Sequence, residues 1–450
     1  MSMKTLPPSA HLEPVVILGA GPSGLLLARY LQLYGVPVVI YERDPSPDFR
    51  PQGGSLDLHD DTGLKALRAT GLMEIAQTHM RPEGEAFTFM DKTGKIWYGD
   101  GPGTAPKPGD AISGRPEIDR TDLRNLLISS LLPDSIRWDH AVAETKVLTN
   151  SLYEVSFKTQ PSITTSILVG ADGAFSRVRP LLHSLKPTYA GMIMYDMTIS
   201  ASSMTPALQS FIGPGAMMAI SDEKGVLPQM NSGGKCKVYV GLKCPEQFVD
   251  ENPLPETGKR EWILNKFFDD WSEEIKDVVR ACDEEYIAPR RIWTTDVDTK
   301  WTTDLTGCTI MGDAAHVMSP FAGEGVNQAL ADALDLGETL VRLHTPPHIT
   351  TSKPFPLTFV PISHAPPAHW KPTTPAPASV HRALRKYERR MYRRVAPIMK
   401  ESLANQAVAF SPGNSARAFK YHFMFYLFPN AIKDMVVEAT WGRLRHLWEY

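Results

Sequence analysis

The sequence predicts an α/β protein built on a Rossmann-like dinucleotide-binding domain. A second domain contains a mixed β-sheet, and the chain ends in helices. Two strand, glycine loop and helix patterns lie far apart in the chain. Such patterns are typical of a parallel sheet covered by helices. The stretch between them changes from alternating strand and helix to mostly strand, which indicates a separate layer.

The first pattern spans residues 14–43. An apolar run at residues 15–18 leads into the motif GAGPSG and a leucine-rich helical pattern, and a second apolar run ends at Glu42. This order of strand, glycine turn, helix and strand is the context in which GxGxxG indicates dinucleotide binding.

Each glycine of that motif has its own physical role. Gly19 permits the tight turn, Gly21 lets the backbone approach a pyrophosphate, and Gly24 lets the helix lie close to the strand. The helix N-terminus presents free N–H groups to a phosphate, and Glu42 stands where a carboxylate accepts hydrogen bonds from a ribose diol. The pattern predicts an adenine dinucleotide, with FAD and NAD as open alternatives.

The second pattern spans residues 308–343. A short strand ends at Gly312 and Asp313, a loop runs through Pro320 to the glycines of GEG, and a helix follows. A carboxylate at Asp313 suits a chain of hydroxyl groups. The backbone N–H groups of residues 323–327 suit the electron-rich edge of a reduced flavin.

Two further features lie between these patterns. Residues 167–172 read as a buried strand that ends at Asp172. Arg120 and Arg124 stand one turn apart on a predicted helix, so both could reach one anionic group.

Composition argues against a nucleic-acid-binding, metal-binding or membrane-spanning protein. The chain has 450 residues and a formal net charge of −3, so it has no global basic field and nucleic acid is not an expected partner. Its four cysteines form no CxxC pair and no zinc spacing, so we expect no metal and a reducing, cytoplasmic compartment. No apolar run approaches the roughly 20 residues needed to cross a bilayer.

The C-terminal part begins with a proline-rich stretch at residues 344–379, which reads as an extended surface insertion. Residues 380–396 resume as a basic helix, whose charges are most simply a solvated face. We treat residues 380–450 as a C-terminal helical segment.

The motifs GAGPSG, VGADGAFSRVR and GDAAHVMSPFAGEGVN, in this order, resemble those of the class A flavin-dependent monooxygenases of the aromatic-hydroxylase type. Within that family, the loop RPQGGSLDLHDDTG and the helix PEIDRTDLR look most like the tetracycline-inactivating flavin monooxygenases. The resemblance covers most of residues 14–343. It implies FAD as cofactor, NADPH or NADH as electron donor, and reaction with O2 to a C4a-hydroperoxyflavin. One oxygen atom would then pass to an organic substrate by hydroxylation, epoxidation or Baeyer-Villiger insertion.

The resemblance also assigns residues, on the positions of this chain that match. It implies that FAD is bound by Gly19, Gly21, Gly24, Glu42, Arg43, Arg120, Arg124, Asp172, Asp313, Pro320, Gly323, Gly325, Val326 and Asn327. It places NADPH at Arg50 and Asp57. The substrate-pocket candidates are Asp196, Met218, Tyr239 and Phe321. No side chain is assigned a catalytic role because the flavin carries the chemistry, and His59 and His316 are expected to be structural.

The same resemblance implies a domain plan. Residues 12–85, 112–185 and 286–343 would form a discontinuous FAD-binding domain, and residues 86–111 and 186–285 the substrate-binding domain. We expect a monomer or weak dimer.

The substrate is expected to differ from tetracycline. Where the tetracycline enzymes are expected to carry Gln, Arg and His, this chain has Asp196, Ala216 and Tyr239. An aromatic or polycyclic natural product of secondary metabolism fits a cavity lined by methionine and aromatic residues better.

Three other functions are alternatives to a monooxygenase. A halogenase of this superfamily should contain a WxWxIP segment, which the sequence lacks, and another flavin oxidoreductase on the same fold stays open. An NAD-dependent dehydrogenase would leave the stretches around Asp172 and Asp313 unexplained. A non-catalytic flavin-binding module would be yellow but would not consume NADPH.

Overall fold

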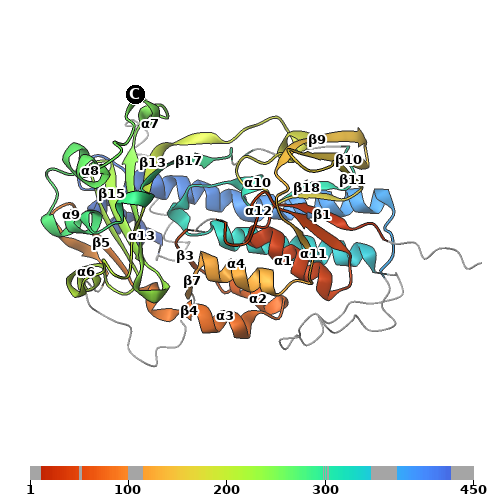
Figure 1. The fold of residues 1–450 in the computed structure, drawn as a ribbon, viewed down its shortest axis with the longest axis horizontal. Helices are drawn as coiled ribbons and strands as arrows, with labels where there is room; N and C mark the ends of the chain where they lie inside the picture. The colour runs from red at the N-terminus through yellow and green to blue at the C-terminus, as the bar shows by residue number, and fades with distance from the viewer. Residues whose placement is uncertain are drawn as a thin grey trace, which may run out of the picture. The chain divides into compact units, whose positions relative to one another are not determined.

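The computed structural model describes residues 12–49, 53–99, 115–296, 298, 301, 304–345 and 372–426 (Figure 1). The chain divides into two compact units. The first unit comprises Met1–Pro82, Ala111–Ala190 and Trp293–Lys400, and the second Glu83–Asp110, Gly191–Ile292 and Glu401–Tyr450. Residues 83–85 and 286–292, predicted for the FAD-binding domain, fall in the second unit, and residues 111 and 186–190, predicted for the substrate-binding domain, fall in the first.

A five-stranded parallel sheet forms the centre of the first unit. Its strand order is β18 (Cys308–Ile310), β12 (Leu168–Gly170), β1 (Val15–Leu18), β2 (Val38–Tyr41) and β8 (Ile136–Arg137). Every neighbouring pair is parallel, and all four residues of β1 are buried. The parallel sheet predicted from the sequence is therefore confirmed.

Helix α1 (Pro22–Leu33) connects β1 to β2. It begins with proline, whose fixed φ suits the first helical position, and it ends before Gly35, which has a φ of 63°. Leu25, Leu26, Leu27 and Leu31 are fully buried, and the helix packs against α11 (Gly325–His344). The strand, helix and strand order predicted for residues 14–43 is thus confirmed.

Two small antiparallel sheets complete the strands of the first unit. One has the order β11 (Ile163–Thr165), β10 (Leu152–Phe157), β9 (Val142–Thr149), and the other the order β3 (Ser55–Asp57), β7 (Glu117–Asp119), β4 (Met80–Arg81). The remaining elements of this unit are α2 (Gly63–Ala69), α3 (Met73–His79), α4 (Arg120–Ser129), α5 (Arg179–Leu182), α10 (Asp313–His316), η4 (Pro320–Ala322) and most of α12 (Pro377–Ala409).

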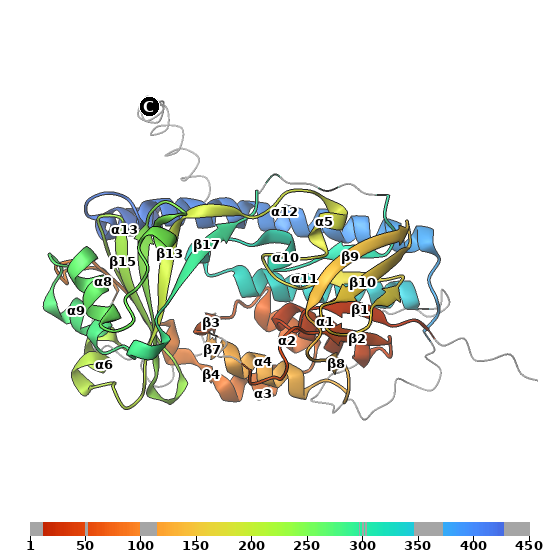
Figure 2. The ribbon, with the colours of Figure 1, turned by 45° about the horizontal axis from the view of Figure 1, so that its top comes forward.

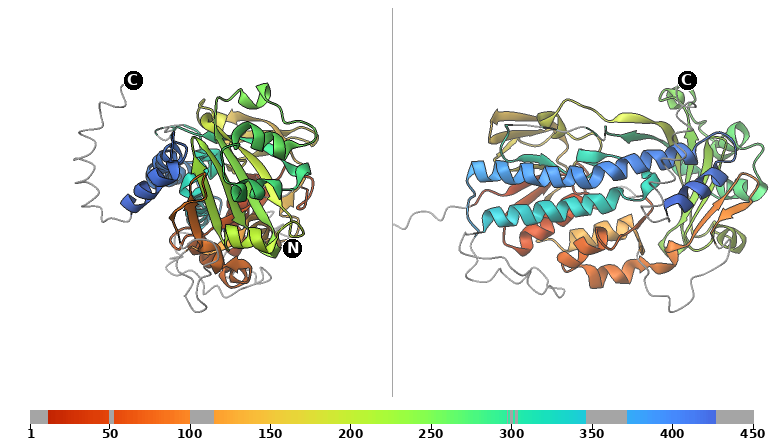
Figure 3. Two further views of the ribbon diagram at one scale, coloured as in Figure 1. Left: turned by 90° about the vertical axis from the view of Figure 1, so that its left-hand side faces the viewer. Right: turned by 180° about the vertical axis from the view of Figure 1, so that it is seen from behind.

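Helix α12 runs alongside α11, as the view from behind in Figure 3 shows. The expectation that its basic residues form a solvated face is wrong for two arginines. Arg390 donates to Asp335 Oδ2 at 3.0 Å, and Arg394 pairs with Asp332, whose side chain is fully buried. The arginines therefore bind α12 to α11, a partnership that periodicity within one helix does not reveal. Of the proline-rich stretch, residues 346–371 lie outside the described residues.

The second unit is built on a seven-stranded mixed sheet. Its order is β17 (Ala288–Thr294), β13 (Thr188–Ile199), β16 (Cys236–Lys243), β15 (Lys224–Met230), β14 (Ala216–Ser221), β5 (Phe87–Met90) and β6 (Ile96–Tyr98). Strands β5 and β6 form an antiparallel hairpin. The β14–β5 pair is parallel, whereas the β13–β16, β16–β15, β15–β14 and β5–β6 pairs are antiparallel.

Helices cover parts of both faces of this sheet. They are α6 (Pro206–Ile212), α7 (Phe248–Glu251), α8 (Lys259–Phe267), α9 (Glu273–Arg280) and α13 (Ser415–Tyr426), with short 3-10 turns η1 (Pro82–Glu85), η2 (Ser232–Gly234) and η3 (Glu284–Tyr286). Figure 2 shows α8 and α9 beside the sheet, and α9 contacts β15. Helix α13 contacts β14, β5 and β6. Among the helices in the described ranges, none is both long and apolar enough to cross a membrane.

Candidate active site

The predicted cofactor motifs lie at one edge of the parallel sheet. The GAGPSG loop follows β1, Glu42 follows β2, Asp172 follows β12 and Asp313 follows β18. These four strands are consecutive in the sheet and parallel, so their carboxyl ends meet at the same edge. Ligands of open parallel sheets bind at this edge.

The glycine loop after β1 has one open position and two closed ones. A Cβ on Gly19 would lie 2.3 Å from the carbonyl oxygen of Ala171, and one on Gly24 would lie 2.2 Å from the carbonyl oxygen of Gly19. A Cβ on Gly21 would meet no atom within 4 Å. Gly21 is also the N-cap of α1 and supplies no side-chain cap, so the first N–H groups of the helix are left for a ligand.

Glu42 is buried and holds the glycine loop in place. Its Oε2 accepts a hydrogen bond from the Ala20 N–H at 2.6 Å, and its Oε1 accepts one from the Asp44 N–H at 3.0 Å. A carboxylate oxygen has two lone pairs, so each oxygen can accept a further hydrogen bond. The neighbouring Arg43 is exposed.

The sequence suggested that the two arginines of α4 reach one anionic group, but in the structure they have different surroundings. Arg124 is buried and donates to the carbonyl oxygens of Pro47 at 2.6 Å and Ala20 at 3.4 Å. Arg120 is exposed, and its side chain lies near Gly53. Arg124 therefore braces the glycine loop from behind, while Arg120 remains accessible.

Asp172 has acceptor capacity that the described residues do not use. Its Oδ2 accepts from the Arg177 N–H at 2.6 Å, and its buried Oδ1 has no hydrogen-bond partner among the described residues. Burial raises the pKa of Asp172, although the Ser176 side chain, the Arg177 N–H and the nearby Arg179 oppose this shift.

Arg179 joins the loop after β12 to the loop after β18. Its Nη2 donates to the backbone oxygen of Asp313 at 3.0 Å and its Nε to that of Ala314 at 2.8 Å. The Asp313 side chain itself is exposed. Arg179 belongs to the motif VGADGAFSRVR, but this role could not be predicted because Asp313 and Ala314 lie more than 130 residues away in the chain.

The loop before α11 is anchored to β3. Asn327 is fully buried; its Oδ1 accepts from the His59 N–H and its Nδ2 donates to the Asp57 carbonyl, both at 2.9 Å. Gly323 has a φ of 67°, and a Cβ on Gly325 would meet no atom within 4 Å. Pro320 is exposed, and Val326 is half-buried.

His59 lies between two carboxylates at this anchor. Its Nε2 is 2.9 Å from Asp57 Oδ2 and its Nδ1 is 2.9 Å from Glu324 Oε1. Burial alone would lower the pKa of His59, but the hydrogen bonds to Asp57 and Glu324 outweigh it and raise the pKa to about 9. Glu324 was not predicted as a site residue, although an acidic residue between two glycines of a cofactor loop could have indicated one.

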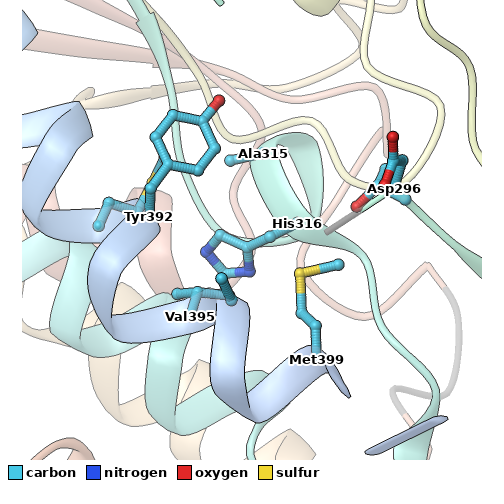
Figure 4. A pocket seen from close by; sticks show the side chains of 9 residues that line it. Asp296, Ala315, His316, Tyr392, Val395 and Met399 are labelled. Atoms are coloured by element: carbon cyan, nitrogen blue, oxygen red, sulfur yellow. The ribbon is translucent and has the colours of Figure 1, made fainter. Parts of the chain in front are cut away.

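His316 is buried behind the second motif, as expected for a structural residue. Its Nε2 lies 2.6 Å from Asp332 Oδ2, and the same oxygen accepts from the Gly312 N–H at 2.8 Å. Figure 4 shows the imidazole facing Tyr392, Val395 and Met399 of α12 across a small pocket. His316 therefore fixes the turn that carries Asp313.

Three substrate-pocket candidates share one face of the sheet in the second unit. Asp196 on β13 is directly opposite Tyr239 on β16, and Tyr239 is opposite Leu227 on β15. Met218 on β14 continues this row, since its neighbour Ala219 pairs with the residue before Leu227. All four are half-buried, whereas the residues that alternate with them are mostly buried.

This row is charged at one end and apolar at the other. Asp196 forms ion pairs with Lys237 and, at 3.4 Å, with Arg290. Leu227 and Met218 at the other end are apolar. The fourth candidate, Phe321, lies in η4 of the first unit and is half-buried.

Two predictions concern residues or sites that are described only in part. Arg50 lies outside the described residues, so the position predicted for NADPH is described at Asp57 alone. Within the described ranges, no group of three or more His, Cys, Asp or Glu side chains is arranged to hold a metal ion.

The family comparison decides the class of protein. The FAD binding domain family matches residues 13–345. The chain belongs to the class A FAD-dependent monooxygenases. Monooxygenase asqM of Emericella nidulans is 30% identical to it over 454 residues, which cover 88% of this chain and 95% of the relative.

Solved structures of other proteins share the fold of this monooxygenase. Klebsiella pneumoniae HpxO, complexed with FAD and uric acid, matches with a TM-score of 0.65 and 18% identity, over 88% of this chain and 89% of that one. Tetracycline destructase Tet(51) matches with a TM-score of 0.64 and 17% identity, over 94% and 97%. The predicted fold class is confirmed, as are FAD as the cofactor and an oxidoreductase as the kind of enzyme.

The structure of this monooxygenase fits FAD at the sheet edge. Gly21 and Gly325 leave space where a Cβ would meet nothing, and Asp172 has a buried oxygen without a partner among the described residues. The N-terminus of α1 adds unsatisfied N–H groups for a diphosphate.

Proposed function

We propose that this monooxygenase uses NAD(P)H to insert one oxygen atom of O2 into an aromatic or polycyclic natural product. The second oxygen atom leaves as water, and NAD(P)+ is released. The observation that supports this most is the meeting of four cofactor motifs at the carboxyl ends of β18, β12, β1 and β2. Hydroxylation, epoxidation and Baeyer-Villiger insertion share this stoichiometry.

Residues from all four strand ends would hold the cofactor. When bound, FAD accepts electrons from NAD(P)H and supplies the oxygen chemistry. Gly19, Gly21 and Gly24 would accommodate its diphosphate, and Asp172 would lie near the same group. Glu42 and Arg43 would bind its ribose, and Asp313 its polyol. The flavin ring would lie against Pro320, Gly323, Gly325, Val326 and Asn327.

The two arginines of α4 would act at different distances from the cofactor. The exposed Arg120 would reach the phosphate and sugar region, whereas Arg124 would act by bracing the Ala20 carbonyl. Arg50 and Asp57 would meet the nicotinamide nucleotide. The carboxylate of Asp57 already accepts from His59, which leaves its other oxygen for a donor on the dinucleotide.

The row from Asp196 to Met218 would bind the substrate. Asp196 and Lys237 can pair with polar groups at one end, and Leu227 and Met218 offer apolar contact at the other. Tyr239 stands between them and can stack on an aromatic ring. A polycyclic molecule with hydrogen-bonding groups at one end matches this gradient better than a small charged acid does.

A panel of aromatic and polyketide-like compounds tests the proposal. We expect at least one compound to stimulate NADPH oxidation and to gain one oxygen atom, taken from labelled O2, in its mass. Tyr239→Ala should raise KM for that compound and leave FAD content unchanged. A yellow protein that oxidises NADPH with none of the panel, and transfers no labelled oxygen, would support a non-catalytic flavin-binding module instead.

A further inference from the structure

The buried contacts of His59 suggest a role that the proposed cofactor site does not assign. Both ring nitrogens face carboxylate oxygens at 2.9 Å, Nε2 towards Asp57 and Nδ1 towards Glu324. An ionised carboxylate only accepts hydrogen bonds, so both nitrogens must donate, and an imidazole that donates twice is a cation. The geometry therefore makes His59 an imidazolium with only 8% of its side chain exposed.

This cation joins two segments that are about 270 residues apart in the chain. Asp57 ends β3, and Glu324 lies between Gly323 and Gly325 at the start of α11. The Asn327 side chain joins the same two segments through backbone groups. The His59 N–H donates to its Oδ1, and its Nδ2 donates to the Asp57 carbonyl. Glu324 is held from its other side as well, since Gln328 Nε2 donates to its Oε2 at 3.0 Å.

We propose that His59 is a positioning residue for FAD, a buried imidazolium that clamps Glu324 and thereby fixes the Gly323–Gly325 turn against β3. The inference rests on the proposed function, in which this turn lies against the flavin ring. The clamp would hold the backbone N–H groups of the turn in one arrangement before the cofactor arrives. Pre-organised donors bind better than donors that must be ordered on binding.

Stability of the fold alone is a poor explanation for this arrangement. Burying charges costs desolvation, so a buried ion cluster is weak evidence for stabilisation. Removing the cation would also leave two carboxylates, on β3 and before α11, without the imidazolium between them and with Arg115 acting on Glu324 alone. Their repulsion would push the turn away from β3.

The charged groups around the imidazole give the clamp a defined pH range. They are Asp57 on β3, Glu324 before α11 and, acting on Glu324, Arg115 before β7. The pKa of His59 is raised from 6.5 to about 9, so the folded protein keeps the imidazolium until the pH approaches 9 and loses it as the pH rises through 9, while the stability that it contributes is complete below pH 6.5. Burial alone would raise the pKa of Glu324, but the hydrogen bonds from His59 and Gln328 and the charges of His59 and Arg115 together lower it.

Variants of the pair separate positioning from general stability. His59→Gln should weaken FAD binding roughly tenfold and speed hydrogen exchange of the backbone amides of residues 323–328 in the apoprotein. Adding Glu324→Gln to His59→Gln should restore most of the loss, since the repulsion disappears. Asp60→Asn is the control: this exposed carboxylate next to His59 pairs with Arg68, and its loss should change neither readout.

The pH profile of wild-type protein keeps the inference testable if His59→Gln does not fold. FAD affinity and amide protection of residues 323–328 should be constant from pH 6 to 8 and fall together near pH 9. In Glu324→Gln, which leaves the imidazole one carboxylate, the fall should move to lower pH. The inference is overturned if His59→Gln binds FAD as wild type does, if adding Glu324→Gln fails to rescue His59→Gln, or if the pH profiles of wild type and Glu324→Gln coincide. Wild-type protein that binds no FAD would instead refute the proposed function.

Discussion

The Cβ position of Gly19 lies 2.3 Å from the carbonyl oxygen of Ala171, so the loops after β1 and β12 meet through backbone atoms. Two residues later, a Cβ on Gly21 would meet no atom within 4 Å. Glycines of the same motif therefore serve different purposes. Gly19 is required by the fold, and Gly21 leaves space for a ligand.

Gly21→Asp should abolish FAD binding and leave the fold intact. The new carboxylate would occupy the space at the N-terminus of α1 and repel a diphosphate, while its backbone φ of −77° suits any residue. We expect colourless protein whose apo-form melts within a few degrees of wild-type apoprotein. Visible absorbance of the purified protein and thermal unfolding measure both. Stoichiometric FAD in this variant would contradict the assignment of the diphosphate.

Gly19→Ala should destabilise the protein even without cofactor. The methyl group would overlap the Ala171 carbonyl, and a φ of 106° is strained for alanine. Overlap and strain together should cost about 3 kcal/mol in the free energy of unfolding. Denaturant unfolding of the apoprotein measures the cost, with Gly21→Ala as the matched control. Equal stability of the two variants would show that the loops do not meet as described.

Local patterns predicted the cofactor loops well because their information is local. The glycines of GAGPSG, the acid after β2 and the acid after β18 all follow apolar runs directly, and parallel strands bring their ends together. Such motifs combine strand, turn and helix chemistry within about thirty residues. The sequence therefore predicted which segments form the site.

Long-range partners could not be predicted in this way. The hydrogen bonds of Arg124 to the backbone of Ala20 and Pro47 were not predicted, and Arg394 was expected to be solvated but pairs with the buried Asp332. An arginine has the same periodicity whether it faces water or a distant carboxylate. The Asp57, His59 and Glu324 cluster was missed for the same reason, since its members belong to separate motifs.

Asp313→Ala should weaken FAD retention more than substrate binding. Asp313 is exposed, and the hydrogen bond that Arg179 donates to it goes to the backbone oxygen, which the substitution keeps. The fold should therefore tolerate the loss, and FAD affinity should fall roughly tenfold through lost hydrogen bonds to hydroxyl groups. Titration of apoprotein with FAD gives the affinity, and KM of the FAD-saturated variant gives the effect on substrate. A larger change in KM than in FAD affinity would contradict the role proposed for Asp313.

Arg394→Met should strongly destabilise the first unit. Asp332 is fully buried and bonded to Arg394, His316 and the Gly312 N–H, so the variant leaves its charge undercompensated. Breaking a buried pair from one side typically costs about 3–5 kcal/mol. Arg342→Met is the control on α11, because Arg342 pairs with Glu338 in an exposed position and should matter little. Similar unfolding free energies for both variants would show that Asp332 does not depend on Arg394.

Glu388→Gln should make stability less dependent on pH between 5 and 8. Glu388 is buried on α12, accepts from Thr309 at 2.8 Å and pairs with Arg385 at 2.7 Å. Burial raises its pKa from 4.5 to about 7, although Arg385 and Thr309 oppose the shift. A raised pKa means that the folded state favours the neutral acid.

The sign of the Glu388 effect follows from that preference. The stabilising contribution of the neutral acid is complete below pH 4.5 and is lost as the pH rises through 7. Glutamine keeps a neutral acceptor at every pH, so its stability relative to wild type should increase by up to about 3 kcal/mol from pH 5 to pH 8. Thermal unfolding across this range measures the difference, with the exposed Glu338→Gln as control. Parallel pH profiles for Glu388→Gln and wild type would show that Glu388 stays ionised, and that Arg385 compensates its burial completely.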